Sequence, residues 1–346
     1  MRNFTDFTIF KDASCLDVLR KLNLEKSNQT LFVLDIDKKL IGTITDGDIR
    51  RGLINGLNIE SPAFLFCNTN FSFINQKIDV SDIRRLKKKG IKVLPKLNQA
   101  GQIEKVYNLL NLKSILPVHA VIMAGGKGER LLPLTENTPK PMLLLGEKPI
   151  IEHCVDGLAS FGIERISISV RYLSNQIINY LGDGTNKGIS ISYIEEDMQM
   201  GTIGCLTKIG KFDDESVLVI NSDIFTNIDL EDFYMAFKNS NADMAVASFP
   251  YSIDIPYAIM DLNENRITSF KEKPKNTYYA NAGIYLIKKE VLTLIPPNSY
   301  YNATDLMDAV LATNGILIHS PITGYWIDIG KHDDYNKAKE LVKHIY

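Results

Sequence analysis

Clustered cysteines, long apolar runs and an excess of charge of one sign are all missing from this sequence. Its four cysteines are widely spaced, with neither a C-x-x-C pair nor a Cys/His cluster, which predicts reduced structural thiols and no zinc site. No window reaches about 18 apolar residues, and the N-terminus carries no apolar signal-peptide core. We therefore expect a soluble, cytoplasmic protein with no membrane partner.

The charge balance bears on the class of partner. The net charge is −2 over 346 residues, of which 23% are charged, so no basic field predicts a nucleic-acid partner. A phosphorylated ligand would have to be held by local cations. A hydrolytic Ser/His triad is also missing, and His153 lies inside a predicted helix, where a structural role is expected.

The stretch 121–143, VIMAGGKGERLLPLTENTPKPML, is the most informative part of the chain. The apolar run Ala120–Met123 leads into three glycines, which predicts a buried strand that ends in a loop with little side-chain cover. Glycine lets backbone N–H groups approach an anion closely. Arg130 follows the glycines, and Lys140 lies between two prolines. Together these features indicate a site for a polyphosphate.

Three known motifs compete for these glycines. The G-x-x-x-x-G-K-[ST] run of a Walker loop is missing. A dinucleotide fingerprint requires a helix directly after the glycines, but Pro133 and the run 138–141 interrupt it, and Glu147 lies in a predicted turn. The third pattern, G-G-x-G-x-R-L followed by P-L-T and P-K-P, resembles the signature of the sugar-1-phosphate nucleotidyltransferases.

This resemblance implies roles for several residues. Arg130 would stabilise charge on the α-phosphate, and Lys140 would assist the leaving pyrophosphate. Glu272 would contact sugar hydroxyls and Lys273 the sugar phosphate. The implied nucleotide-binding residues are Ala124, Gly125, Gly126, Gly128, Gly201 and Thr202, and the other residues implied in the sugar site are Asn281 and Gly283.

Two aspartates follow short apolar runs. Asp223 comes just after the run Val217–Ile220, and Asp328 lies in the segment 326–330, WIDIG. Ligands of open α/β sheets bind at the carboxyl ends of central strands, which places Asp223 at such an end. The resemblance implies that both aspartates bind Mg²⁺, an ion that takes one or two carboxylates together with phosphate oxygens and waters.

The order of predicted elements divides the chain at about Leu116-Pro117, into domains of residues 1–116 and 117–346. From Val118 onward strands and helices alternate, which is typical of a doubly wound sheet. Shorter strands at 258–261, 267–271 and 282–287 predict a substrate-binding layer on that sheet, and Thr304 is predicted to cap a helix. The expected fold class is α/β, a Rossmann-like doubly wound mixed sheet of the nucleotidyltransferase fold, preceded by an α+β module.

Residues 1–116 contain a doubled helix–strand–strand outline, with G-T-I-T-D-G-D-I-R-R in the first copy. This outline resembles a tandem CBS pair, which implies adenine-nucleotide binding and association into a homo-oligomer. The resemblance implies that Thr45 and Asp48 contact a ribose and a phosphate. Tyr107 and Leu110 replace them in the second copy, so one nucleotide site is expected. A purely structural dimerisation module is the alternative.

Taken together, the sequence predicts an enzyme that transfers a nucleotidyl group from an NTP to a sugar-1-phosphate with Mg²⁺, giving an NDP-sugar and pyrophosphate. The CBS fusion resembles the guanylyltransferases of bacterial legionaminic acid synthesis, which implies GTP and glucosamine-1-phosphate. Transfer to mannose-1-phosphate, or thymidylyl or uridylyl transfer to glucose-1-phosphate, remains open. A catalytically silent nucleotide sensor is the alternative of another class.

Overall fold

The computed structural model describes residues 7–24, 30–75 and 79–345 and separates them into two compact units. The N-terminal unit runs to Leu116 and includes Ser160–Gly162, and the second unit comprises 117–159 and 163 onward. Within the described residues, no helix is long and apolar enough to cross a membrane.

The N-terminal unit is built from two similar halves. In the first half, α1 (Cys15–Leu24) and α2 (Asp46–Ile54) accompany a sheet of β1 (Thr8–Phe10), β2 (Thr30–Leu34) and β3 (Leu40–Thr45). In the second, α3 (Val80–Lys88) precedes the antiparallel pair β4 (Val93–Leu97) and β5 (Ile103–Asn108). The helix–strand–strand outline predicted for each half is therefore confirmed.

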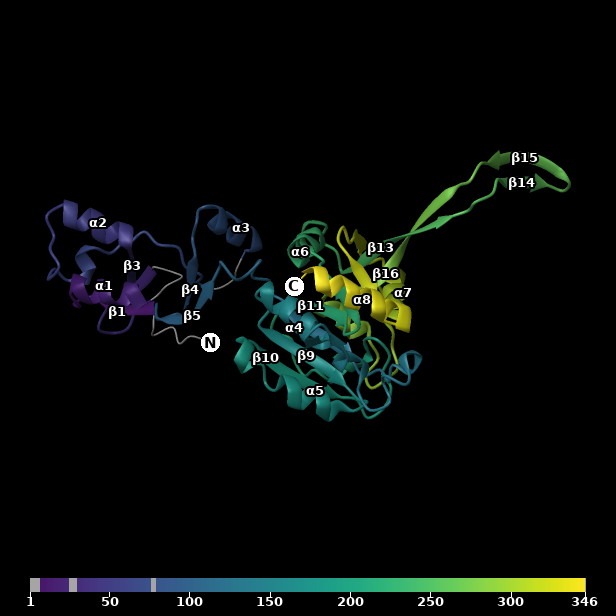
Figure 1. The fold of residues 1–346 in the computed structure, drawn as a ribbon, viewed down its shortest axis with the longest axis horizontal. Coiled ribbons are helices and arrows are strands. Elements are labelled where there is room, and N and C mark those ends of the chain that lie inside the picture. Colours follow the sequence, from purple (N-terminus) through teal and green to yellow (C-terminus); the bar gives the residue numbers. More distant parts are fainter. Residues whose placement is uncertain (1–6, 25–29, 76–78, 346) are drawn as a thin grey trace. The chain divides into compact units, whose positions relative to one another are not determined.

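A seven-stranded mixed sheet organises the second unit (Figure 1). The strands β10 (Ser190–Glu195), β9 (Arg165–Val170), β6 (His119–Ala124) and β11 (Ser216–Asn221) run parallel. Next come β16 (Lys275–Lys288), antiparallel to both its neighbours, then β13 (Met244–Asp254) and β17 (Leu317–Pro321). This arrangement is the predicted α/β mixed sheet.

The central position of β11 follows from its composition. Val217–Ile220 are all apolar and almost fully buried, as expected for a strand covered on both faces. On one face, Val217 and Val219 pack in a core cluster with Leu306 and Val310 of α7 (Ala303–Ala312). The other helices of the unit are α4 (Ile150–Ser160), α5 (Ser174–Leu181), α6 (Leu230–Asn239) and α8 (His332–Ile345).

Small ribbons complete the second unit. The strand β12 (Ile224–Thr226), which follows β11, pairs antiparallel with β18 (Trp326–Asp328), and β7 (Leu144–Leu145) pairs with β8 (Lys148–Pro149). The 3₁₀ turns Glu129–Leu131 and Lys140–Met142 follow β6. The β12–β18 ribbon brings the neighbourhood of Asp328 to the end of β11.

Two expectations about this unit were wrong. Asn302, not Thr304, caps α7, because its side chain forms a capping box with Asp305. The segments 258–261 and 267–271, predicted as a layer on the main sheet, do not lie on it, and 282–287 is part of β16 within that sheet. The first two segments belong to β14 (Ile259–Asn263) and β15 (Arg266–Lys271), a separate exposed pair at the end of a long ribbon made by β13 and β16 (Figure 1).

Candidate active site

A cavity of about 650 Å³ lies at the carboxyl ends of the four parallel strands of the second unit. Each strand delivers its following residues to the cavity wall: Gly125 after β6, Arg171 after β9, Glu196 after β10 and Asn221 at the end of β11. Neighbouring parallel strands end at one edge of a sheet, so these segments meet although they are far apart in sequence. Ser222 secures the junction, since its N–H donates to the carbonyl of Met123 at 3.0 Å.

The glycine loop passes close to its neighbours, which explains its composition. Gly128 adopts φ +67°, and a Cβ at this position would lie 2.9 Å from Cβ of Lys140. A Cβ on Gly125 would lie 3.4 Å from the carboxylate of Glu196. Thr135 Oγ1 donates to the carbonyl of Gly128 at 2.9 Å and fixes the loop from behind. The backbone of the loop is therefore presented to the cavity with little side-chain cover.

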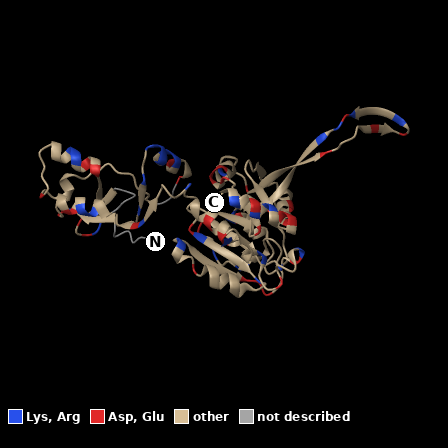
Figure 2. Cartoon of the chain, viewed as in Figure 1, with Lys and Arg blue, Asp and Glu red and all other residues tan. Residues whose placement is uncertain are grey.

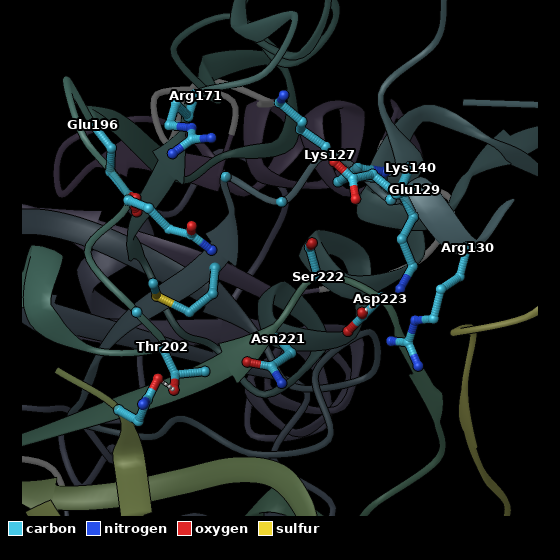
Figure 3. A pocket seen from close by; sticks show the side chains of 18 of the residues that line it. Lys127, Glu129, Arg130, Lys140, Arg171, Glu196, Thr202, Asn221, Ser222 and Asp223 are labelled. Atoms are coloured by element: carbon cyan, nitrogen blue, oxygen red, sulfur yellow. Dashed lines mark hydrogen bonds and ion pairs between the residues drawn. The ribbon is translucent and has the colours of Figure 1, made fainter. Parts of the chain in front are cut away.

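Lys140 and Asp223 form the charged centre of the site. Lys140 is buried, and its Nζ lies 2.5 Å from Oδ2 of Asp223. The second oxygen of that carboxylate, Oδ1, is buried and has no hydrogen-bond partner among the residues that the structure describes. Figure 3 shows Arg130 and Lys140 on the side of the cavity where Asp223 lies, with Arg171 and Glu196 across from them. A buried carboxylate oxygen without a partner is costly, so the site is built to receive a donor or a cation.

Asp328 lies next to this centre. In the β12–β18 ribbon, Asp328 is opposite Ile224, and the N–H of Ile329 donates to the carbonyl of Asp223 at 3.0 Å. Partial burial raises the pKa of Asp328, the negative charge of Asp223 raises it further, and Lys140 and Arg130 oppose the increase. Two carboxylates close enough for the charge of Asp223 to raise the pKa of Asp328 fit a cation with hard oxygen ligands.

The described residues offer no group of three or more His, Cys, Asp or Glu side chains arranged to hold a metal ion. Asp223 and Asp328 thus provide a pair of carboxylates and not a complete protein cage. That donor set fits Mg²⁺, which is commonly held by one or two carboxylates and completed by substrate phosphates and water.

The segment that contains Gly201 and Thr202 forms another wall of the cavity. Gly201 adopts φ +72°, and a Cβ there would lie 2.5 Å from the carbonyl oxygen of Tyr301. Thr202 Oγ1 accepts from the N–H of Ala303 at 3.1 Å, which joins this wall to the start of α7. Both residues line the cavity, as do most of the residues predicted in the glycine loop. Those are Gly125, Gly126, Gly128 and Arg130, whereas Ala124, the buried last residue of β6, does not line the cavity.

Of the four residues predicted for the sugar site, two lie close behind the cavity wall and two do not line the cavity. Gly283 adopts φ +73°, and a Cβ there would lie 2.7 Å from Nδ2 of Asn221, so β16 passes directly behind the cavity wall. Asn281 is near this point and accepts from the N–H of Gly283 at 2.9 Å. Glu272 and Lys273, in contrast, are exposed beyond the outer end of β16 and do not line the cavity.

Several residues that line the cavity belong to no motif recognised in the sequence. Glu196 is buried, receives a hydrogen bond from Ser169 Oγ, and accepts from the N–H of Met200 at 3.4 Å. Arg171 follows β9 directly. Both follow parallel strands of the main sheet, and the rule that ligands bind at strand carboxyl ends could have identified them. The remaining cavity residues without a motif are Gln199, Asn221, Ser222, Tyr300 and Asn302.

In the N-terminal unit, Thr45 and Asp48 bind each other. Thr45 is the N-cap of α2 and accepts from the N–H of Asp48, while the carboxylate of Asp48 accepts from the N–H of Thr45 at 2.8 Å. Arg51 forms an ion pair with the same carboxylate. The two residues predicted to contact a nucleotide therefore form a capping box.

Known proteins resemble the second unit in sequence and in structure. A mannose-1-phosphate guanylyltransferase of Mycobacterium tuberculosis is 29% identical over 235 residues, which are 66% of this chain and 66% of that protein. A UTP–glucose-1-phosphate uridylyltransferase of Synechocystis is 29% identical over 239 residues, 63% of this chain and 62% of that protein. The chain thus spans just under two thirds of the length of these relatives.

A solved structure resembles the fold, and a family model gives the assignment. HddC from Yersinia pseudotuberculosis, solved in complex with GMP-PN, superposes with a TM-score of 0.51 at 25% identity, over 65% of this chain and 99% of that chain. A family model described as nucleotidyl transferase matches residues 119–344. The chain therefore belongs to the nucleotidyl transferase family.

Proposed function

We propose that residues 117–346 transfer a nucleotidyl group from an NTP to a sugar-1-phosphate, giving an NDP-sugar and pyrophosphate. The observation that carries this proposal is the Lys140–Asp223 pair beside Asp328 and Arg130, in which one oxygen of Asp223 has no hydrogen-bond partner within the described ranges of the chain. Two carboxylates for a divalent ion and two cations for phosphates, at the end of a glycine loop, are the parts that this chemistry requires.

The reaction needs no general base from the protein. The second pKa of a phosphate monoester is about 6, so a sugar-1-phosphate is largely a dianion near neutral pH. One of its oxygens forms a bond to the α-phosphorus of the NTP while the bond from that phosphorus to the bridging oxygen breaks, and pyrophosphate leaves with the electron pair. Phosphoryl-group transfer of this kind depends mainly on positioning and charge neutralisation.

The residues of the cavity would supply both the positioning and the charge neutralisation. Backbone N–H groups of the loop 125–128 would position the NTP phosphates, and the fixed guanidinium of Arg130 would stabilise the negative charge that develops at the α-phosphorus. Lys140 would neutralise the departing pyrophosphate. Asp223 and Asp328 would hold Mg²⁺, which when bound draws charge away from the phosphate oxygens.

The nucleobase and sugar are narrower proposals. The guanylyltransferase of M. tuberculosis and the GMP-PN complex of HddC support GTP, while the uridylyltransferase of Synechocystis supports UTP. With the N-terminal outline that resembles a CBS pair, we favour GTP and glucosamine-1-phosphate, as in legionaminic acid synthesis. Mannose-1-phosphate and glucose-1-phosphate are the competing acceptors.

For the N-terminal unit we propose one adenine-nucleotide site at the start of α2. The sequence G-T-I-T-D-G-D-I-R-R supports it, and the capping box favours the competing role, a dimerisation module without ligand, because it already occupies Thr45 and Asp48. A nucleotide would have to replace or extend those hydrogen bonds.

A matrix of four NTPs against several sugar-1-phosphates, read as pyrophosphate release, tests the transferase proposal. One NTP–sugar pair should exceed the others by a large factor, and Arg130→Ala should abolish most of that signal. If no NTP–sugar pair gave pyrophosphate release but the chain still bound an NTP, this result would instead support a catalytically silent sensor.

A further inference from the structure

The net charge of −2 is the sum of a basic part and an acidic part of the chain. Residues 1–116 carry 19 Lys or Arg and 12 Asp or Glu, a formal charge of +7, whereas residues 117–346 carry 20 and 29, a formal charge of −9. Most of the positive charge comes from residues 79–113, which contain nine Lys or Arg and three Asp or Glu. Such a local excess creates a field that the charge of the whole chain does not reveal.

The cations gather on α3 and directly after it. Figure 2 shows this concentration of Lys and Arg. No ion pair or hydrogen bond joins the side chains of Lys88, Lys89 or Lys92 to the residues that the structure describes. We define the basic patch as the five exposed cations of this segment, which are Arg84, Arg85, Lys88, Lys89 and Lys92.

The stability of α3 does not explain this many cations. The partial negative charge at a helix C-terminus favours a cation in the last turn, but like charges one turn apart destabilise a helix. Arg84 and Lys88 are one turn apart, as are Arg85 and Lys89. The ion pair of Arg85 with Asp82 offsets one of these charges. The remaining repulsion costs stability, which indicates that the cations serve to bind an anion.

An exposed leucine lies beside the basic patch, in the loop that follows β5. The N–H of Leu109 donates to the carbonyl of Lys92 at 2.8 Å. A second bond joins the loop to α3, since Nζ of Lys87 donates to the carbonyl of Leu112 at 2.6 Å. Leu110, between these two points, is 57% exposed. The loop therefore presents an aliphatic side chain to solvent among cations.

These features fit the surface of an anionic lipid bilayer better than a nucleic acid. Clustered Lys and Arg are attracted by the negative surface potential of such a bilayer, and an aliphatic side chain gains by entering the boundary between headgroups and acyl chains. A nucleic acid would attract the same cations through its phosphates. Its unpaired bases stack on aromatic side chains, however, and the basic patch contains none.

We propose that the basic patch and Leu110 attach the N-terminal unit to a bilayer surface that contains anionic lipids. The cations lie over the headgroups, and Leu110 enters the boundary with the acyl chains. The attachment is peripheral and reversible, because a single leucine buries little apolar surface and salt screens the attraction. The lack of a spanning segment, which led to the expectation of no membrane partner, does not bear on a peripheral contact.

Co-sedimentation of the full-length chain with lipid vesicles tests the attachment. The vesicles are either pure phosphatidylcholine or an equimolar mixture of phosphatidylcholine and the anionic phosphatidylglycerol. The wild type should bind only the anionic vesicles, and binding should be lost at about 1 M salt, where the Debye length is about 3 Å. Binding to neither kind of vesicle, or equally to both, would overturn the proposal.

Two matched double variants locate the contact. Lys88→Gln with Lys89→Gln removes two charges from the basic patch, and the control Lys38→Gln with Lys39→Gln removes two from an exposed adjacent pair in the first half of the same unit. Each cation near an anionic surface is worth roughly fivefold in binding, so the patch variant should bind at least about tenfold more weakly. The control should stay within about twofold of the wild type, because its charges lie outside the contact. Equal binding by the two double variants would show that the basic patch does not bind the bilayer.

Leu110→Gln separates a bilayer from a nucleic acid, because it removes the aliphatic group without changing the charge. It should weaken binding to the anionic vesicles by at least about threefold, since less apolar surface is buried. Duplex RNA at the same concentration of phosphate groups serves as the competing probe. An unchanged affinity of Leu110→Gln for the vesicles, or tighter binding of the wild type to the RNA than to the vesicles, would overturn the bilayer as the partner.

Discussion

Replacement of Lys140 by methionine isolates the charge at the centre of the candidate site. The substitution keeps the length of the side chain but removes the ammonium that lies 2.5 Å from Asp223. Only 11% of the Lys140 side chain and 25% of the Asp223 side chain are exposed. The variant therefore leaves a largely buried carboxylate that has lost its cation and still lies beside Asp328.

The expected loss follows from that geometry. Removing one member of a buried ion pair leaves the other charge desolvated. For this partly open site we expect a loss of about 2 kcal/mol in the free energy of unfolding. For a unit of this size that corresponds to a decrease in melting temperature of roughly 4–8 °C. Transfer should also slow, because the same ammonium is proposed to neutralise pyrophosphate.

The assay uses the single tryptophan of the chain. Trp326 lies in β18, two residues before Asp328, so its fluorescence reports unfolding of the second unit. The matched control is Lys148→Met, which breaks a more exposed ion pair with Asp156 and should change stability by less than about 1 kcal/mol. Mg²⁺ should stabilise Lys140→Met more than wild type, because Asp223 is then free to bind it.

A double-mutant cycle with Asp223→Asn completes the test. The double variant should lose clearly less than the sum of the two single losses, since neither partner is left charged and alone. The reasoning would be refuted if Lys140→Met melted like Lys148→Met, or if the two losses at Lys140 and Asp223 were simply additive.

Three further predictions concern catalysis, the N-terminal unit and pH. In steady-state kinetics, Arg130→Ala should lower kcat far more than it raises KM, with a loss of about 2–4 kcal/mol in transition-state stabilisation. An effect on KM alone would instead show that Arg130 binds the substrate in its ground state. Asp48→Ala should abolish AMP binding to the full chain in calorimetry. The control Asp79→Ala removes the N-cap of α3 in the same unit, so it should lose a similar stability of about 1 kcal/mol and keep AMP binding. Equal AMP binding by both variants would show that Asp48 has only a structural role as part of the capping box. His119, whose Nε2 lies 2.8 Å from Ser167 Oγ, has a pKa held below its usual 6.5 by burial and by Arg165. The unfolded chain therefore binds the proton first, so stability should fall as pH decreases from about 7 through 6.5 toward the folded pKa. His119→Asn should flatten that part of the curve of melting temperature against pH, and an unchanged slope would contradict the assignment.

The sequence predicted the centre of the site because each of its parts has a strong local signal. The run Val217–Ile220 could only be a buried strand, and the glycines after Ala120–Met123 required a close backbone approach. Once both strands were placed in one parallel sheet, their carboxyl ends had to meet, and Arg130, Lys140 and Asp223 came with them.

The parts that sequence reasoning missed have weaker local signals. Alternating patterns at 258–261 and 267–271 indicate strands but do not specify which strands they pair with, so the sequence predicts them on the main sheet, whereas they pair with each other as β14 and β15. The cap of α7 depended on a choice between Asn302 and Thr304 that only the reciprocal bond with Asp305 decides. Glu196 and Arg171 belong to no recognised motif and became visible only through the strand order.

Pyrophosphate release by the full-length wild-type chain, measured with each of the four NTPs with and without a sugar-1-phosphate, tests the central claim most directly. The account predicts release that requires both substrates and Mg²⁺ and that falls by at least about tenfold in Arg130→Ala. Release that is independent of the sugar-1-phosphate, or undiminished in Arg130→Ala, would contradict it.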